Sequence, residues 1–187
     1  MPHCGILNDR EIIELCTGED AMLDPFIDHQ EGAPSYGLSS FGYDLRLGEV
    51  FILHRSHRAS VIDPLDIDKV LFKTVVTAGT VFNLQPHSQV LAESVERFIM
   101  PDDVMGEVKG KSSYARCGLL VNTTVLEPGW RGVLTIELAN LSDLPIVLHI
   151  GQGIGQAVFQ RGNSPLMTYD QKKCARYQDQ TGAQLPK

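Results

Sequence analysis

A nine-residue segment, residues 110–118, concentrates groups that could hold a phosphorylated ligand. It reads Gly-Lys-Ser-Ser-Tyr-Ala-Arg-Cys-Gly and so contains two cations, two serine hydroxyls and two glycines. Backbone N–H groups, hydroxyls, lysine and arginine can together satisfy several phosphate oxygens and offset their charge. The segment is not a Walker A loop, because the G-x-x-x-x-G-K spacing is absent. It predicts either a phosphate-binding loop or a polar turn between two strands.

Glu137 is a second candidate, this time for proton transfer. A Pro-Gly turn at residues 128–129 precedes the segment 133–138, in which polar and apolar residues alternate. Glu137 therefore shares one face of a strand with Thr135, opposite an apolar face. A glutamate in this position is commonly a solvated surface residue. If the face lines a cleft instead, burial raises the pKa of the carboxyl and suits it to general acid–base catalysis.

The C-terminal part of the chain offers a third group of polar and aromatic side chains. Gln156 is followed at a distance by Tyr169, Arg176 and Gln180. A tail that carries an aromatic ring, a cation and amides could close over a bound nucleotide. Composition alone favours a simpler interpretation, in which the polar segment after Gln171 is a loose terminus.

The motif pair of zinc-dependent deaminases is not present. Those enzymes use H-x-E followed by P-C-x-x-C to bind the metal and position the proton carrier, and this sequence contains no P-C-x-x-C. The cysteines Cys4, Cys16, Cys117 and Cys174 are scattered and form no C-x-x-C pair. We therefore expect no zinc and no metal held by protein ligands, and we interpret the cysteines as small, partly buried apolar residues.

Short β-rich runs must position these groups, and they dominate the chain from about residue 42 onward. Glycine- and proline-containing turns separate the runs, and no strand alternates with a long helix, which disfavours a doubly wound nucleotide-binding fold. Many short strands with such punctuation predict an all-β barrel or sandwich. The runs cover residues 50–53, 74–76, 81–84, 90–92, 119–121, 133–136, 146–150 and 157–159.

The N-terminal part differs from the rest. Asn8 and Glu11 have the spacing of a capping box, which predicts a short helix over about residues 8–17, and Gly18 is placed to end it. Residues 24–40 are rich in Pro, Gly and Ser and predict an extended connection.

Length and charge limit the classes of protein that remain. The 187 residues, 43% of them apolar, fit one soluble domain over residues 1–187. A net charge of −7 disfavours binding to nucleic acid polymers, although local cations could still hold a small anion. No apolar run reaches the roughly 18 residues that span a bilayer, and the N-terminus has no secretory signal pattern. We expect a cytoplasmic protein without membrane contact.

Taken together, these segments resemble the dCTP deaminase family, a branch of the dUTPase superfamily, in its bacterial form. The motif G-[KR]-S-S-x-A-R-x-G, followed some twenty residues later by P-G-W and then T-[IL]-E-[LF], carries most of the resemblance. Further matches are Ser-Ser-Phe-Gly-Tyr-Asp-Leu-Arg at residues 39–46, Gly-Gln at residues 155–156 and Arg-Tyr-Gln-Asp-Gln at residues 176–180. The matches cover most of the chain and keep the family's order.

The resemblance implies a distorted β-barrel of jelly-roll type that assembles as a homotrimer, with active sites at subunit interfaces. It implies a hydrolase that converts dCTP to dUTP and ammonia without zinc and so feeds dUMP and dTTP synthesis. Magnesium would accompany the triphosphate as a charge-neutralising ion, and residues from about 170 to 187 would form a closing tail.

The resemblance also implies roles for single residues. Glu137 would donate and accept protons, Ser112 would help to hold the attacking water, and Arg116 would orient and stabilise the site. Thr135 and Ile136 would present backbone groups near the cytosine. The complete set implied for substrate binding is Lys111, Ser112, Ser113, Tyr114, Ala115, Arg116, Thr135, Ile136, Glu137, Gln156, Tyr169, Arg176 and Gln180.

One segment departs from the family pattern. Residues 122–127 read Asn-Thr-Thr-Val-Leu-Glu, which matches neither deaminase-only relatives nor those that also cleave the triphosphate. Glu127 stands where many relatives have an aspartate, and a longer side chain there argues against efficient pyrophosphate release. A bifunctional enzyme, a dUTPase and a nucleotide-binding regulator without activity remain as alternatives.

Overall fold

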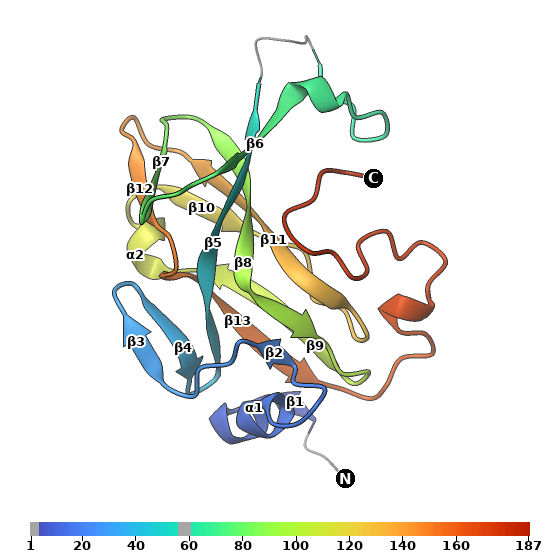
Figure 1. Ribbon diagram of the computed structural model, residues 1–187. Coiled ribbons are helices and arrows are strands. Elements are labelled where there is room, and N and C mark those ends of the chain that lie inside the picture. Colours follow the sequence, from blue (N-terminus) through green and yellow to red (C-terminus); the bar gives the residue numbers. More distant parts are fainter. Residues whose placement is uncertain (1–3, 56–60) are drawn as a thin grey trace.

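The computed structural model describes residues 4–55 and 61–187, so residues 1–3 of the N-terminus, which was expected to carry no export signal, lie outside the described part. Strands dominate the structure, which confirms the all-β class (Figure 1). The elements are β1 (Gly5–Ile6), α1 (Asp9–Cys16), β2 (Leu23–Asp24), β3 (Gln30–Gly32), β4 (Ser35–Ser39), β5 (Gly42–His54), η2 (Lys69–Leu71), β6 (Phe72–Val76), β7 (Val81–Leu84), β8 (Gln89–Ile99), β9 (Val104–Gly110), α2 (Ser112–Ala115), β10 (Leu119–Asn122), β11 (Arg131–Asn140), β12 (Ile146–His149), β13 (Gly153–Arg161) and η3 (Tyr169–Gln171).

Antiparallel pairing joins most of these strands into one curled sheet. Its central path runs β1-β13-β5-β8-β11-β10, while β12 and β7 form a separate pair. The curl gives half of a barrel, and its concave side encloses a core that includes the fully buried rings of Tyr43, Phe51, Phe98 and Phe159. Every apolar run predicted from the sequence lies inside one of these strands, apart from Ile150, which follows the end of β12, and several of the strands extend well beyond the run that predicted them. The long central strands β5, β8 and β11 therefore form the rigid frame on which functional side chains are mounted.

The N-terminal helix forms as its capping signal predicts. The Asn8 side chain accepts a hydrogen bond from the Glu11 backbone at 3.2 Å, and the Asn8 backbone N–H donates to the Glu11 carboxylate at 3.1 Å. This reciprocal pair satisfies two backbone donors that a helix start leaves free. The helix ends at Cys16, Thr17 is its C-cap, and Gly18 follows with φ of +124°. Ile12 and Cys16 are the buried residues of the helix.

The prediction for residues 24–40 is wrong in part, because a β-hairpin of β3 and β4 lies inside this segment. Its glycines suggested a connection, but they serve close backbone approach. At Gly37, with φ of +97°, a Cβ atom would lie 2.0 Å from the His29 carbonyl oxygen. Only glycine allows that contact at that backbone angle. A glycine-rich composition that is typical of a loop therefore belongs to a hairpin in this segment.

The interpretation of residues after Gln171 as a loose terminus is also wrong. The C-terminal tail, residues 168–187, runs beside β11 (Figure 1). The Asp179 N–H donates to the Arg131 carbonyl, and the Val133 N–H donates to the Gln180 carbonyl, both at 2.9 Å. Hydrogen bonds to a strand edge need no apolar periodicity, so composition alone could not show this docking.

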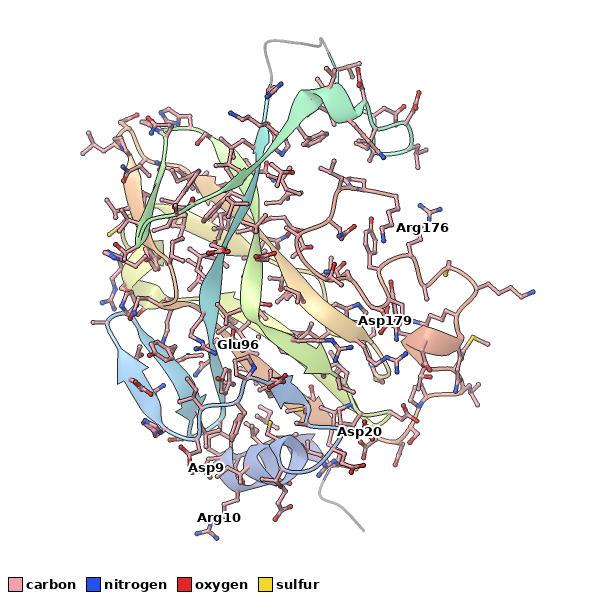
Figure 2. All side chains as sticks on the ribbon, in the orientation of Figure 1. Asp9, Arg10, Asp20, Glu96, Arg176 and Asp179 are labelled. Atoms are coloured by element: carbon pink, nitrogen blue, oxygen red, sulfur yellow. The ribbon has the colours of Figure 1, made fainter. Side chains whose placement is uncertain are left out.

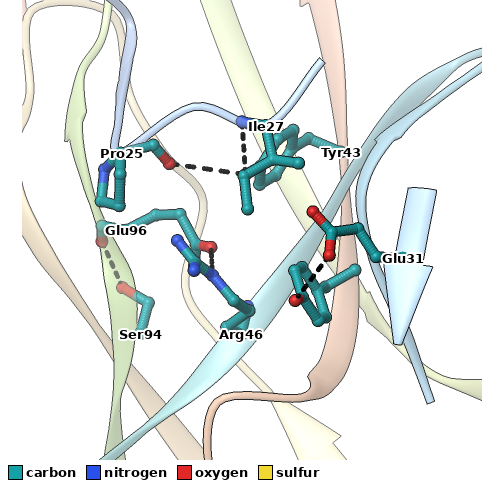
Figure 3. Close-up of polar contacts among 8 residues, drawn as sticks. Pro25, Ile27, Glu31, Tyr43, Arg46, Ser94 and Glu96 are labelled. Carbon is teal, nitrogen blue, oxygen red and sulfur yellow. Dashed lines mark hydrogen bonds and ion pairs between the residues drawn. The ribbon is translucent and has the colours of Figure 1, made fainter. Parts of the chain in front are cut away.

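A buried ion pair links the central strands β5 and β8. The Arg46 guanidinium donates to Glu96 at 2.7 Å, and the Arg46 backbone N–H donates to the same carboxylate at 3.0 Å (Figure 3). Burial raises the pKa of Glu96, while the contacts with Arg46 lower it. The Glu96 side chain is fully buried, so its charge depends on Arg46 for compensation. The Ser94 hydroxyl donates to the Glu96 carbonyl and accepts from Leu134 N–H, which connects the pair to β11.

The cysteines are mostly not buried. Cys16 lies in the core, where burial raises the pKa of its thiol to about 12, but Cys4, Cys117 and Cys174 are exposed. The interpretation of all four as partly buried apolar residues is therefore wrong for three of them. These three lie on loops or near a chain end, outside the apolar alternation that marks the core. None of the helices in the described ranges has the length and apolar character needed to cross a membrane.

Candidate active site

A pocket of about 350 Å³ opens between β11 and the C-terminal tail. Its volume lies within the range of small-molecule sites. β11 contributes Thr135 and Glu137 from its polar face, and the tail contributes Tyr169 and Gln180. The complete lining is Leu91, Thr124, Val125, Leu126, Glu127, Trp130, Leu134, Thr135, Glu137, Tyr169, Tyr177, Gln180, Gln184 and Pro186.

Glu137 occupies the polar face of β11 at the point where β10 ends. Asn122, the last residue of β10, lies directly opposite in the strand register, and its amide donates to the Glu137 carboxylate at 2.6 Å. Burial raises the pKa of Glu137, and the hydrogen bond from Asn122 partly counteracts that effect. The carboxyl is therefore half-buried, oriented by one amide, and easier to protonate than an exposed glutamate.

The tail forms the opposite wall of the pocket because it continues the pairing of β11 beyond β10. The Gln180 amide donates to the Val133 carbonyl at 2.5 Å and to the Thr135 hydroxyl at 3.2 Å. Thr135 also accepts from the Gln184 N–H at 3.1 Å. The Gln178 amide likewise donates to the Gly129 carbonyl. The side chains of Gln178 and Gln180 thus bind backbone carbonyls in a region where β10 no longer pairs with β11.

Aromatic rings fix the outer part of the tail. The Trp130 indole N–H donates to the Tyr177 carbonyl at 3.0 Å, and the Tyr177 N–H donates to the Tyr169 hydroxyl at 3.2 Å. Lys172 forms an ion pair with Glu127 and lies over the Tyr169 ring. The pocket consequently holds two carboxyl groups in different settings: Glu137 beside an amide, and Glu127 beside a cation.

The serine–arginine loop, residues 111–116, lies elsewhere on the same chain. Figure 1 shows α2 and the C-terminal tail on opposite sides of the sheet, and none of the loop residues lines the pocket. Ser112, Ser113 and Arg116 are exposed, as is Ala115. Tyr114 is buried, and its hydroxyl accepts from the His149 N–H at 3.0 Å, so its ring supports the fold and only its backbone remains for a ligand.

The predicted binding residues therefore form two groups and two outliers. Thr135, Glu137, Tyr169 and Gln180 meet in the pocket. Lys111 and Gln156 lie at the loop, since β13 pairs with both β9 and β5 there. Ile136 has a fully buried side chain. Arg176 is exposed on the tail and donates to the Lys187 carbonyl at 2.6 Å (Figure 2).

Several residues of the site were not predicted from the sequence. Asn122, which lies beside the pocket and is not part of its lining, is the most important, because it holds the Glu137 carboxyl. Its pairing spans the loop between β10 and β11, and sequence patterns do not fix register over such a distance. Trp130 and Tyr177 lie in segments that the sequence analysis used only for the family resemblance. Gln184 lies in the segment that composition predicted to be a loose terminus.

One zinc-type triplet does occur in the sequence, His-Gln-Glu at residues 29–31. Its histidine and glutamate are exposed and contact each other at 3.2 Å, and the histidine also contacts Asp28 at 2.8 Å. In the ranges that the structure describes, no three His, Cys, Asp or Glu side chains gather as metal ligands. The triplet is thus a surface ion-pair group.

Comparison with known proteins identifies the class. The family model described as dCTP deaminase-like matches residues 6–162, which include the serine–arginine loop and Glu137. The chain therefore belongs to the dCTP deaminase-like family. It is 41% identical to the dCTP deaminase of Campylobacter fetus and 43% identical to that of Campylobacter curvus, in each case over 98% of both chains.

A solved structure supports the fold. The 2'-deoxycytidine 5'-triphosphate deaminase from Agrobacterium tumefaciens matches 86% of this chain with a TM-score of 0.65 and 21% identity. The chain spans about half the length of that protein, since the match covers 48% of it. The distorted barrel that the sequence resemblance implied is confirmed at the level of fold. The family match ends at residue 162, so the tail that completes the pocket lies beyond it.

Proposed function

We propose that the chain catalyses the hydrolytic deamination of dCTP to dUTP and ammonia in the cytoplasm, without zinc, and so supplies dUMP and dTTP synthesis. The observation that carries the proposal is the half-buried Glu137, held by an amide in a pocket large enough for a nucleoside. Full-length relatives named dCTP deaminase, at about 41% identity, support the choice of substrate.

Glu137 would do the work that a metal ion does in other deaminases. Its carboxylate takes a proton from water as the water oxygen bonds to C4 of cytosine. The same carboxyl then passes the proton to N3, and a further proton transfer lets the exocyclic nitrogen leave as ammonia while the C4 oxygen becomes a carbonyl. A raised pKa suits both steps, because the group must accept and release protons near neutral pH.

The serine–arginine loop would enter this site from a neighbouring copy in a homotrimer. Ser112 would help to hold the attacking water, and Arg116 would stabilise negative charge that develops around C4. Lys111, Ser113, Tyr114 and Ala115 complete the proposed loop set, with Gln156 beside it. Magnesium would arrive with the triphosphate as part of the substrate. Support comes from the exposure of the loop and from its absence, within one chain, from the lining of the pocket that contains Glu137.

A second candidate function rests on Glu127, the other carboxyl in the pocket. A bifunctional deaminase and diphosphatase, or a dUTPase, would use such a group to activate water against the triphosphate. The ion pair between Glu127 and Lys172 argues against this role, because the cation already occupies the carboxylate that would have to hold the attacking water. A nucleotide-binding regulator would need no proton carrier, so the environment of Glu137 argues against that alternative.

One assay separates these functions. The purified chain is treated with a zinc chelator, supplied with magnesium and either dCTP or dUTP, and followed for ammonia and pyrophosphate separately. Ammonia from dCTP without pyrophosphate is the expected result. Pyrophosphate from either nucleotide would support the bifunctional enzyme or the dUTPase, and binding without either product would support the regulator.

Removing the amide that holds Glu137 should shift the pH dependence of the reaction. In Asn122→Ala, the hydrogen bond that lowers the pKa of Glu137 is lost, so this pKa should rise. The protonated carboxyl cannot take a proton from water, and the acid limb of kcat/KM should therefore move to higher pH. Asn163→Ala, at an exposed position, serves as a control. An acid limb unchanged in Asn122→Ala would show that Glu137 does not control the profile.

A methyl group at Gly129 should push the tail away from the pocket. Gly129 has φ of +78°, and a Cβ atom there would lie 2.6 Å from the Asp170 carboxylate and 2.8 Å from the Thr168 Cβ. Gly129→Ala should raise KM for dCTP and lower the free energy of unfolding by about 1–2 kcal/mol for the backbone angle alone. Gly151→Ala is the matched control, because Gly151 has φ of +72° with nothing within 4 Å. Equal KM values for the two variants would contradict a role of the docked tail in binding.

A further inference from the structure

We propose that Asp44 is a positioning residue for the serine–arginine loop, and that Lys111 is the anchor it holds and not a ligand of the triphosphate. This inference rests on the proposed function and reassigns one residue within it. Asp44 lies on β5 and Lys111 lies at the start of α2, so the contact joins the loop to the central sheet.

Both donor groups of Lys111, the ammonium and the backbone N–H, already have partners within the chain, which leaves one of the three ammonium N–H groups. Its ammonium donates to the Asp44 carboxylate at 2.5 Å and to the Ser35 hydroxyl at 2.9 Å. Its backbone N–H donates to the Ile154 carbonyl at 3.1 Å. Three different strands, β5, β4 and β13, thus hold one residue. The Lys111 side chain is only 16% exposed, unlike the exposed Ser112 next to it.

Electrostatics explains why the lysine should stay in place when nucleotide binds. The Asp44 side chain is 3% exposed, and its two carboxylate oxygens differ in their hydrogen-bond partners. Oδ2 accepts from Lys111 at 2.5 Å and from the Gln30 amide at 2.6 Å, whereas Oδ1 is buried with no partner in the described part of the chain. Moving Lys111 to a phosphate would leave a buried carboxylate without its cation, which is strongly unfavourable. Phosphate contacts are then left to the exposed hydroxyls and to Arg116.

This arrangement gives the loop a fixed starting point. The Ala115 N–H donates to the Lys111 carbonyl, and the Arg116 N–H donates to the Ser112 carbonyl, so the short helix begins where the anchor is placed. Displacing a binding group by about 1 Å can cost on the order of 100-fold in rate or affinity. Asp44 would therefore affect nucleotide binding through geometry, although it touches no nucleotide atom.

The two roles of Lys111 predict opposite results for Asp44→Asn. If Lys111 is an anchor, Asp44→Asn and Lys111→Met should raise KM for dCTP by similar factors, on the order of 10- to 100-fold, with a smaller change in kcat. The double variant should be no worse than the worse single variant, because both remove one contact. If Lys111 binds phosphate, Lys111→Met should raise KM while Asp44→Asn leaves it unchanged or lowers it, and our proposal would be wrong.

Two further variants guard against failure to fold and against general charge effects. Ser35→Ala removes the second partner of the ammonium with little change in volume and should raise KM in the same direction. Lys109→Met removes an exposed lysine that pairs only with Glu107 in the described structure and should leave KM unchanged. A Ser35→Ala variant with unchanged KM, or a Lys109→Met variant with the same defect as Lys111→Met, would contradict the anchor.

A measurement without nucleotide separates this proposal from the proposed function. Amide hydrogen exchange in residues 112–116 should be faster in Asp44→Asn than in the parent chain, because the loop loses its anchor. This readout holds even if the chain never turns over dCTP. Unchanged exchange in these residues would overturn the positioning role, whereas faster exchange in a chain that releases no ammonia would overturn only the function.

Discussion

Glu137→Gln should reduce kcat for dCTP deamination by roughly 10²- to 10⁴-fold while KM changes little. The amide keeps the shape of the side chain and can still accept the hydrogen bond that the Asn122 amide now gives to the carboxylate at 2.6 Å. It cannot take a proton from water or return one to the base. The defect should therefore appear in the chemical step and not in binding.

A surface glutamate provides the matched comparison for this variant. Glu107 on β9 is exposed and pairs with Lys109, so Glu107→Gln should change neither kcat nor KM. Single-turnover measurement of ammonia release would compare the variants without interference from product release. A Glu137→Gln variant that keeps most of the parental rate would remove the residue assigned to proton transfer.

Arg46→Met should destabilise the fold strongly. It leaves the fully buried Glu96 carboxylate without its cation, and breaking one partner of a buried pair typically costs about 3–5 kcal/mol of unfolding free energy. Chemical denaturation at neutral pH measures this loss. The double variant Arg46→Met with Glu96→Leu should recover most of it, because no charge then remains buried. A loss below about 1 kcal/mol in the single variant would show that the pair contributes little.

The pH dependence of this loss has a definite sign. Burial already raises the pKa of Glu96 above that of an exposed glutamate, and Arg46→Met removes the guanidinium that lowers this pKa, while the backbone N–H of residue 46 stays in place. A carboxyl with a raised pKa in the folded state binds its proton more tightly than in the unfolded chain. The tighter binding of this proton by the folded state adds to the free energy of unfolding. This contribution is fully present below the pKa of Glu96 in the unfolded chain, and it is lost as the pH rises through the pKa of Glu96 in the folded state. Arg46→Met should therefore lose stability with rising pH more steeply than the parent.

The sequence was most informative where one physical rule determines the structure. Apolar runs with turn residues between them predicted β5, β8 and β11, and the capping pair at Asn8 predicted α1. The strand β9 was not predicted, although Val104, Gly106 and Val108 alternate toward the core. Gly106 interrupts the apolar pattern because a Cβ atom there would lie 2.9 Å from the Leu126 side chain. Close packing of β9 against Leu126 thus requires a glycine at position 106, and this glycine interrupts the alternation of apolar residues that would have predicted the strand.

The candidate site shows the same division. Alternation placed Glu137 and Thr135 on one face of a strand, and both line the pocket. Whether that face was solvated or enclosed depended on the tail, which docks through hydrogen bonds from the Gln178 and Gln180 side chains to backbone carbonyls at and just before β11. Such contacts leave no periodic trace in the sequence. The sequence also showed that Lys111 carries a charge. It could not show that Asp44 pairs with this charge, because the two residues come from parts of the chain that are far apart in sequence.

The measurement that tests the proposed chemistry most directly is the structure of Glu137→Gln with dCTP and magnesium bound. We expect the C4 edge of cytosine beside the side chain at position 137, inside the pocket between β11 and the tail. The triphosphate should contact the loop of residues 112–116 from a neighbouring copy. Nucleotide bound outside this pocket, or a side chain at position 137 turned into solvent far from the loop of every copy, would contradict the proposed mechanism.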